Sequence, residues 1–204
     1  KARTMTELTA VAATRIAPDL DAAEEGIRMY MRAIGLDTEH PTLVDTPRRV
    51  AHAGLDLFSG IDGDPHRALG GGEPIEGVYP GPVAVHDIPY SSMCEHHLLP
   101  FQGVVSVVYL PDRALAGIGD FDAMLRVLAA RPQMQERLAD QIAEVVSDTL
   151  GAKGVLVRLT AQHACMWARG ERTVGATAFS LAARGVYDTD PSARAEARVL
   201  LGLR

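Results

Sequence analysis

Residues 83–110, VAVHDIPYSSMCEHHLLPFQGVVSVVYL, join two stretches of β-strand character through a segment rich in metal-binding side chains. Residues 83–88 and 104–110 contain many β-branched residues, which favour strands. Between them, Cys94 and His97 are three residues apart, so one tight turn can present both side chains to the same metal ion. The stretch therefore predicts two strands with a candidate metal-binding turn between them.

The second cysteine of the chain, Cys165, lies far along the sequence and also stands close to a histidine. Thiolate and imidazole ligands favour zinc over hard cations. Three ligands, Cys94, His97 and Cys165, would leave a fourth position open for water, as in catalytic zinc sites, where the pKa of that water falls to about 7. The alternative is two buried structural cysteines beside surface histidines, because spacing alone does not establish proximity.

Two further histidines, His96 and His163, stand beside these candidate ligands. His96 cannot easily share an ion with adjacent His97, because neighbouring side chains diverge, but it can donate or accept a proton there. His163 precedes Cys165 by two residues, so on an extended segment both face the same side. Each histidine alone would more often be a hydrogen-bonded structural residue.

The rest of the second half alternates between helical and strand patterns. One helix is expected to begin at Asp120 or Asp122, and Pro132 separates it from another that ends at Gly151. Two more strands are expected, over 155–162 and 174–187. The order is β-β-α-α-β-β, an α+β fold with one ligand segment between the first two strands and the other just after the third.

The first part of the chain has a different character. Residues 1–19 are expected to form a loose lead-in, followed by one helix that runs to about Gly35 and another that begins at Thr46-Pro47. Many Gly and Pro residues then predict a linker or long loop. The expected division is a helical region over 1–60, a linker over 61–82 and a catalytic domain over 83–204.

Composition narrows the classes of function. The chain has 204 residues, 47% of them hydrophobic, and a net charge of −6. It has no apolar run of the roughly 18 residues that a membrane helix requires, and no secretion signal opens it. It has no cluster of Lys and Arg of the kind that nucleic-acid binding requires. We therefore expect a cytoplasmic protein with no membrane or nucleic-acid partner, whose cysteines are metal ligands rather than a disulfide.

Four other polar residues are candidates for binding a substrate. Gln135 and Glu136 lie near the start of a helix, where a carboxylate could accept two hydrogen bonds from the amidine-like edge of guanine. On these residues alone, helix N-terminal electrostatics are the better explanation of a glutamate there. Arg49 and Arg169 are candidates for a phosphate or carboxylate partner, although a surface ion pair is the commoner role of a single arginine.

Taken together, these residues resemble the GTP cyclohydrolase I family, whose members are zinc enzymes that open the imidazole ring of GTP. Five segments carry the resemblance, in the family's order and approximate spacing. They are Asp45-Thr46-Pro47-Arg48-Arg49-Val50-Ala51, Cys94-Glu95-His96-His97, Tyr109-Leu110-Pro111, Arg131-Pro132-Gln133-Met134-Gln135-Glu136-Arg137-Leu138 and His163-Ala164-Cys165-Met166-Trp167-Ala168-Arg169-Gly170.

The resemblance implies a tunnelling fold whose subunits form β-barrels in a homodecamer of two pentamers, with active sites at subunit interfaces. It also implies a role for each candidate residue. These are zinc ligation by Cys94, His97 and Cys165, acid-base catalysis by His96 and His163, guanine recognition by Glu136 beside Gln135, and phosphate binding by Arg49 and Arg169. In the implied reaction water attacks C8 of the purine, His163 helps to protonate the ring nitrogen, and formate is lost before closure to a dihydropterin.

The chain departs from the family pattern where the triphosphate is held. The family's serine, lysine and arginine in this region correspond to Gly119, Asp120 and Ala123, and the lysine expected three residues after Arg49 is His52. Cations are lost and an anion is gained, which penalises a tetra-anion electrostatically. Three arginines could compensate, namely Arg48, Arg113 and Arg126.

Three hypotheses follow. The first is a zinc-dependent cyclohydrolase that opens a guanine nucleotide, a nucleoside or a related purine at C8. The second is GTP cyclohydrolase I activity proper, with a rearranged triphosphate site. The third is a non-catalytic relative that binds purines or pterins, against which the retention of all three ligands and both histidines argues.

Overall fold

The computed structural model describes residues 17–77, 81–169 and 173–203, so most of the expected lead-in over 1–19 lies outside the described residues. The helices of this part are α1 (Leu20–Ala33), α2 (Thr46–Leu57), α3 (Pro65–Leu69), α4 (Ile118–Ala129), α5 (Gln135–Leu150), α6 (Ala164–Trp167), α7 (Val186–Thr189) and α8 (Pro191–Leu200). The strands are β1 (Glu73–Pro74), β2 (Val83–Cys94), β3 (Pro100–Leu110), β4 (Ala114–Leu115), β5 (Pro132–Gln133), β6 (Gly154–His163) and β7 (Ala178–Gly185).

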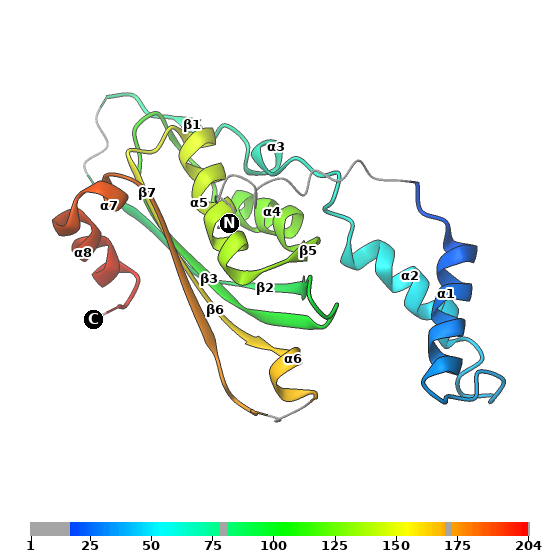
Figure 1. Ribbon diagram of the computed structural model, residues 1–204. Helices are drawn as coiled ribbons and strands as arrows, with labels where there is room; N and C mark the ends of the chain where they lie inside the picture. Colours follow the sequence, from blue (N-terminus) through cyan, green and yellow to red (C-terminus); the bar gives the residue numbers. More distant parts are fainter. Residues whose placement is uncertain (1–16, 78–80, 170–172, 204) are drawn as a thin grey trace, which may run out of the picture.

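The main sheet has the strand order β5-β2-β3-β6-β7. Its neighbours are antiparallel, except that the two-residue strand β5 runs parallel to the end of β2. The long strands curl, and α5 lies across one face of the sheet with α4 beside it (Figure 1). The expected order of four long strands and two central helices is confirmed, with strands one and two longer than the sequence pattern indicated.

Alternation along the strands separates the two faces of the sheet. Val105 and Val107 of β3 and Val157 and Leu159 of β6 are fully buried in the core beneath the helices. The helices α4 and α5 supply the facing side chains, among them Phe121, Met124, Leu138, Ile142 and Val146. The opposite face packs a smaller cluster under α7 and α8, two short helices that the sequence pattern did not predict.

The expected linker or long loop over 61–82 contains a short helix, α3, in its central part. Asp64 caps α3 by accepting the backbone N–H groups of His66 and Arg67, and Pro65 occupies the first turn. Leu69 at the end of α3 is fully buried in the main core, so this segment packs against α4 and α5. The Gly and Pro residues that suggested a loop instead form helix ends and close backbone contacts.

The helices α1 and α2 agree with their expected bounds, and Asp19 caps α1. They pack mainly on one another and extend away from the sheet (Figure 1). The apolar side chains of α1 are only partly covered, because Met31 is buried while Tyr30 and Ile34 are exposed. Among the described residues, no helix combines the length and apolar character needed to cross a membrane.

Candidate metal centre and active site

Strand register brings the two ligand segments to the same edge of the sheet. Ser92 of β2 pairs with Phe101 of β3, and Phe101 pairs with His163 of β6. Cys94 is the last residue of β2, and His163 is the last residue of β6. Because β3 lies between these strands, residues some 70 positions apart in sequence end up as near neighbours.

The turn that follows β2 is tight. The backbone N–H of Leu98 donates to the carbonyl oxygen of Cys94 at 2.8 Å, and the N–H of Cys94 donates to the carbonyl oxygen of Leu99 at 2.9 Å. Leu98 has a φ of 49°, a left-handed conformation that bulky residues rarely adopt. These bonds close the chain around Glu95, His96 and His97, so His97 returns toward Cys94.

The predicted metal ligands are close together. The donor atoms of Cys94, His97 and Cys165 lie within 4.8 Å of one another. Zinc holds sulfur at about 2.3 Å and imidazole nitrogen at about 2.0 Å, so tetrahedral ligands are separated by roughly 3.5–3.8 Å and these donors need to close by about 1 Å. Two thiols and one imidazole fit zinc in chemistry and number, with a fourth position left for a non-protein ligand.

The environment of the thiols depends on their burial and on nearby charges. Cys94 is buried and Cys165 is half-buried. Burial raises the pKa of the Cys165 thiol, and proximity to Cys94 raises it further. The positive charge of Arg169 acts in the opposite direction, which places Arg169 in electrostatic reach of this thiol. A bound cation would favour the Cys165 thiolate, which burial disfavours.

His163 is held in a defined orientation. Its Nε2 lies 2.8 Å from Oε1 of Gln135, and its ring stacks on Phe101 with a centroid separation of 4.8 Å. Gln135 is buried and donates its Nε2 to the carbonyl oxygen of Leu159, which assigns Oε1 as the atom facing the histidine. Nε2 of His163 is therefore the protonated nitrogen of the neutral ring, and within the described residues no hydrogen bond occupies Nδ1, which is available for proton transfer.

Electrostatics act on His163 in two directions. Burial lowers the pKa of His163, and the carboxylate of Glu136 partly opposes that shift. Glu136 also contributes to the raised pKa of Tyr90, after the larger effect of burial. The Tyr90 hydroxyl is buried and has no hydrogen-bond partner in the part of the chain that the structure describes. Tyr90 was not predicted from the sequence, although its position four residues before Cys94 places it on the same face of β2.

His96 differs from His163 in its exposure. Its side chain is 62% exposed. Its Nδ1 lies 3.9 Å from Sγ of Cys94, and its Nε2 lies 3.8 Å from Oε1 of Glu95. His96 is therefore beside the candidate metal group, as expected, and faces solvent.

The predicted phosphate contacts are not all brought to this edge within one chain. Arg169 is close to Cys165, whereas Arg49 lies on the projecting helix α2 and pairs with Asp45 at 3.3 Å. A hollow of about 380 Å³ on α2 is lined by Asp45, Arg48, Arg49 and His52. It gathers two arginines and the histidine that replaces the family's lysine.

The structure shows what contacts Asp120, one of the positions that depart from the family pattern, and where the three arginines that could compensate lie. Asp120 accepts the backbone N–H of Gly117 at 2.9 Å, so its carboxylate caps α4. Of the three arginines that could compensate, Arg126 pairs with Asp122 on its own helix. Arg113 lies against Gly151, at the C-terminal end of α5 and so away from Gln135 and Glu136 at its start. Arg48 remains beside Arg49 on α2.

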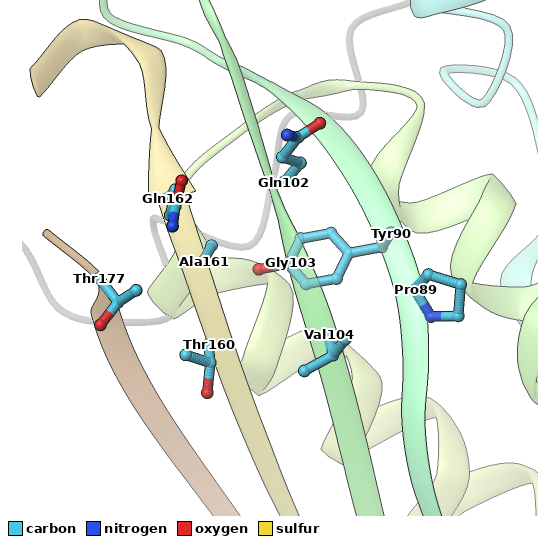
Figure 2. A pocket seen from close by; sticks show the side chains of 9 residues that line it. All are labelled: Pro89, Tyr90, Gln102, Gly103, Val104, Thr160, Ala161, Gln162 and Thr177. Atoms are coloured by element: carbon cyan, nitrogen blue, oxygen red, sulfur yellow. The ribbon is translucent and has the colours of Figure 1, made fainter. Parts of the chain in front are cut away.

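A second hollow, of about 490 Å³, lies over strands β2, β3 and β6 (Figure 2). Gln102 and Val104 of β3 and Thr160 and Gln162 of β6 contribute side chains to it, and alternation places them on the face away from α4 and α5. Its lining includes none of the three candidate metal ligands. It is therefore distinct from the metal group.

Comparison with known proteins agrees with the site geometry. The sequence profile of the GTP cyclohydrolase I family matches residues 23–201. GTP cyclohydrolase 1 of Leifsonia xyli subsp. xyli is 45% identical over 179 residues, which cover 88% of this chain and 93% of the relative. GTP cyclohydrolase 1 of Dehalococcoides mccartyi strain ATCC BAA-2266 is 42% identical over 180 residues, which cover 87% of this chain and 94% of the relative.

The solved structures include the archaeosine synthase QueF-Like in the apo form, with a TM-score of 0.42 and 22% identity over 52% of this chain and 96% of that one. The family profile is the stronger finding, because it includes both ligand segments, the start of α5 and the helix α2. With the profile extending over most of the sequence and the relatives aligned over nearly their whole length, this chain belongs to the GTP cyclohydrolase I family.

Proposed function

We propose that this chain is a zinc-dependent cyclohydrolase that opens the imidazole ring of a guanine nucleotide at C8 and releases formate. The observation that carries the proposal is the convergence of Cys94, His97 and Cys165 beside an oriented histidine, His163. The names of the relatives support the reaction type. A non-catalytic relative would have no need for a free, oriented proton-transfer group at an open metal site.

The residues divide the chemistry among them. Bound at the three ligands, zinc would supply a Lewis acid and activate water for attack on the purine. Gln135 holds Nε2 of His163, so in the imidazolium form Nδ1 carries the proton that His163 can transfer to the ring nitrogen. Glu136 is exposed at the start of α5 and can accept two hydrogen bonds from the amidine edge of guanine. His96, exposed beside Cys94, is a second proton-transfer group.

The number of phosphates on the substrate is a separate part of the proposal. GTP is the substrate that the names of the relatives support. The changes at Gly119, Asp120 and Ala123 favour weaker discrimination between GTP and nucleotides with fewer phosphates, because they remove cations and add an anion. Arg48, Arg49, His52 and Arg169 are the remaining candidates for binding phosphate.

We also infer that the active site is shared between copies of the chain. Arg49 lies on α2, which extends away from the sheet (Figure 1), and the hollow that it lines includes none of the candidate metal ligands, so another copy can supply it. Strand β7 carries exposed apolar side chains, Phe179 and Leu181, at the edge of the sheet. Pairing of sheet edges between copies would close a barrel, which supports a cyclic assembly such as the expected homodecamer. The cytoplasmic location and the division into 1–60, 61–82 and 83–204 remain predictions.

A substrate panel tests the proposal. Zinc-loaded protein would be incubated with GTP, GDP, GMP and guanosine, and formate and pterin absorbance would be followed. The cyclohydrolase proposal predicts formate release from at least one of these compounds, with kcat/KM for GTP and GMP closer than a triphosphate-specific site would give. A strong preference for GTP supports GTP cyclohydrolase I activity proper, and no turnover at full zinc occupancy contradicts both.

A further inference from the structure

A bidentate salt bridge joins the metal-binding turn to the start of α5. Nη1 of Arg137 lies 2.6 Å from Oε2 of Glu95, and Nη2 lies 3.0 Å from Oε1. The side chains are 9% and 25% exposed. Two parallel N–H···O bonds between a guanidinium and a carboxylate fix geometry as well as contribute energy, and partial burial limits screening by solvent.

Each partner depends on the other. Among the described residues, Glu95 is the only acceptor of hydrogen bonds from the Arg137 guanidinium, and Nε of Arg137 is buried there without a partner. The hydrogen bonds from Arg137 are the main cause of the lowered pKa of Glu95. Removing either side chain would leave a partly buried charge without its counter-ion, which is costly.

The position of the pair connects it to both ligand segments. Glu95 lies between Cys94 and His97, and its backbone N–H donates to the carbonyl oxygen of Gln133 just before α5. Arg137 and Gln135 both lie in the first turn of α5, and Gln135 orients His163 beside Cys165. The first turn of α5 therefore contacts the first ligand segment through Arg137 and the second through Gln135.

Besides the backbone hydrogen bonds that close the turn, its side chains have few contacts that would hold the ligands. His97 is exposed, and its ring makes no hydrogen bond within the described part of the chain. Leu98 is exposed as well and has a left-handed backbone conformation. Neither packing nor side-chain bonding of these two residues accounts for the approach of His97 to Cys94.

We propose that Arg137 and Glu95 are positioning residues that hold the turn so that Cys94 and His97 converge with Cys165 on the metal. This inference rests on the proposed zinc-dependent function. Neither Glu95 nor Arg137 is one of the three candidate ligands, so the expected effect of the pair is on metal affinity and site geometry. Partners that orient metal ligands typically change metal affinity about 10–100-fold when they are removed.

The chain offers a matched control on the same helix. Nη2 of Arg184 on β7 lies 2.6 Å from Oδ1 of Asp140 on α5, and their side chains are 33% and 22% exposed. This pair joins α5 to the sheet, as Arg137 and Glu95 do, but Asp140 belongs to none of the segments that carry the metal ligands. Its loss reports the structural cost of breaking a partly buried ion pair of α5.

The experiment measures zinc affinity by competition with a chelator for the full chain, for Glu95→Gln and Arg137→Met, and for the controls Asp140→Asn and Arg184→Met. Cobalt-substituted protein gives the ligand-field spectrum, and thermal unfolding of metal-free protein gives stability. We expect zinc affinity to fall about 10–100-fold in Glu95→Gln and Arg137→Met, with an altered cobalt spectrum. The controls should retain the affinity and spectrum of the unaltered chain. Arg137→Lys, which keeps the charge but loses the bidentate geometry, should fall between these values.

Equal zinc affinity in Glu95→Gln, Arg137→Met and the unaltered chain would overturn the inference, as would an equal loss in the controls. If Arg137→Met does not fold, Glu95→Gln and Arg137→Lys decide the question. Absence of zinc binding by the unaltered chain would contradict the proposed function itself, so the two failures are distinguishable.

Discussion

At the residue scale, the orientation of His163 decides how the candidate site can work. Gln135 accepts a hydrogen bond from Nε2, which leaves Nδ1 as the proton-transfer atom. The sequence predicted both residues for the site but assigned Gln135 to the substrate. The hydrogen bond to His163 supports an orienting role for this buried side chain, and a direct substrate contact remains a prediction.

Replacing Gln135 tests this orientation. We expect Gln135→Leu to lower kcat about 10–100-fold with little change in KM, because the ring loses the bond that fixes its tautomer. Gln135→Glu should restore an acceptor. Since a nearby negative charge favours the imidazolium, it raises the pKa of His163 and moves the alkaline limb of the pH profile of kcat to higher pH. Gln162→Leu is the control, because Gln162 directly precedes His163 in the sequence but is exposed on the other face of β6.

Asp120 provides a residue-scale test of substrate choice. We expect Asp120→Lys to raise the ratio of kcat/KM for GTP over that for GMP by about tenfold, because two units of charge change where the family carries a lysine. The lost cap should lower the free energy of unfolding by about 1 kcal/mol. Asp120→Asn removes the charge and keeps an oxygen for the Gly117 N–H, so its ratio should be intermediate. An unchanged ratio in steady-state kinetics would place Asp120 outside the phosphate site.

At the scale of elements, strand alternation and helix spacing made the central fold predictable. The long strands and the two central helices follow the order that the sequence pattern indicated. The helix α3 within 61–82 was not predictable from the sequence, because the Gly and Pro residues around it resemble those of a loop. The burial of α3 also depends on residues that are distant in sequence. The same limit applies to α7 and α8, which are short, and to the pairing of Glu95 with Arg137, which joins segments 42 positions apart.

Gly103 tests the close approach of β3 to β6. A Cβ at this position would lie 1.8 Å from the carbonyl oxygen of Thr160 and 2.8 Å from Cα of Ala161, both backbone atoms. We expect Gly103→Ala to lower the free energy of unfolding by about 2–3 kcal/mol in urea titration. Gly119→Ala is the control, because a Cβ there meets nothing within 4 Å and alanine favours the helix by roughly 0.5 kcal/mol. Equal effects of the two changes would contradict this description of the sheet.

At the scale of the whole molecule, the α2 arginines line a hollow that includes none of the candidate metal ligands. The sequence alone could identify both groups but could not show that they lie on separate parts of the chain. The exposed apolar residues of α1, α2 and β7, among them Tyr30, Ile34, Val50 and Phe179, indicate surfaces that another copy can cover. An assembly would both bury these residues and complete the site.

Complementation tests whether copies share the site. We expect Arg49→Ala and Cys165→Ser to be inactive alone and to regain part of the activity when they are unfolded and reassembled together, since some interfaces then combine an intact metal group with an intact Arg49. A mixture of Cys165→Ser and His163→Ala should not recover, because both changes fall within the same chain's group. Recovery in neither mixture, with normal assembly by light scattering, would contradict a shared site.

The most direct test of the central claim is formate release from GTP by zinc-loaded and zinc-stripped protein, with Cys165→Ser as the ligand variant. The account predicts about one zinc per chain and formate release in the loaded protein, loss of both after stripping or in Cys165→Ser, and recovery of the stripped protein when zinc is returned. Formate release that is unchanged by stripping or by Cys165→Ser would contradict it, as would a fully zinc-loaded protein that releases none.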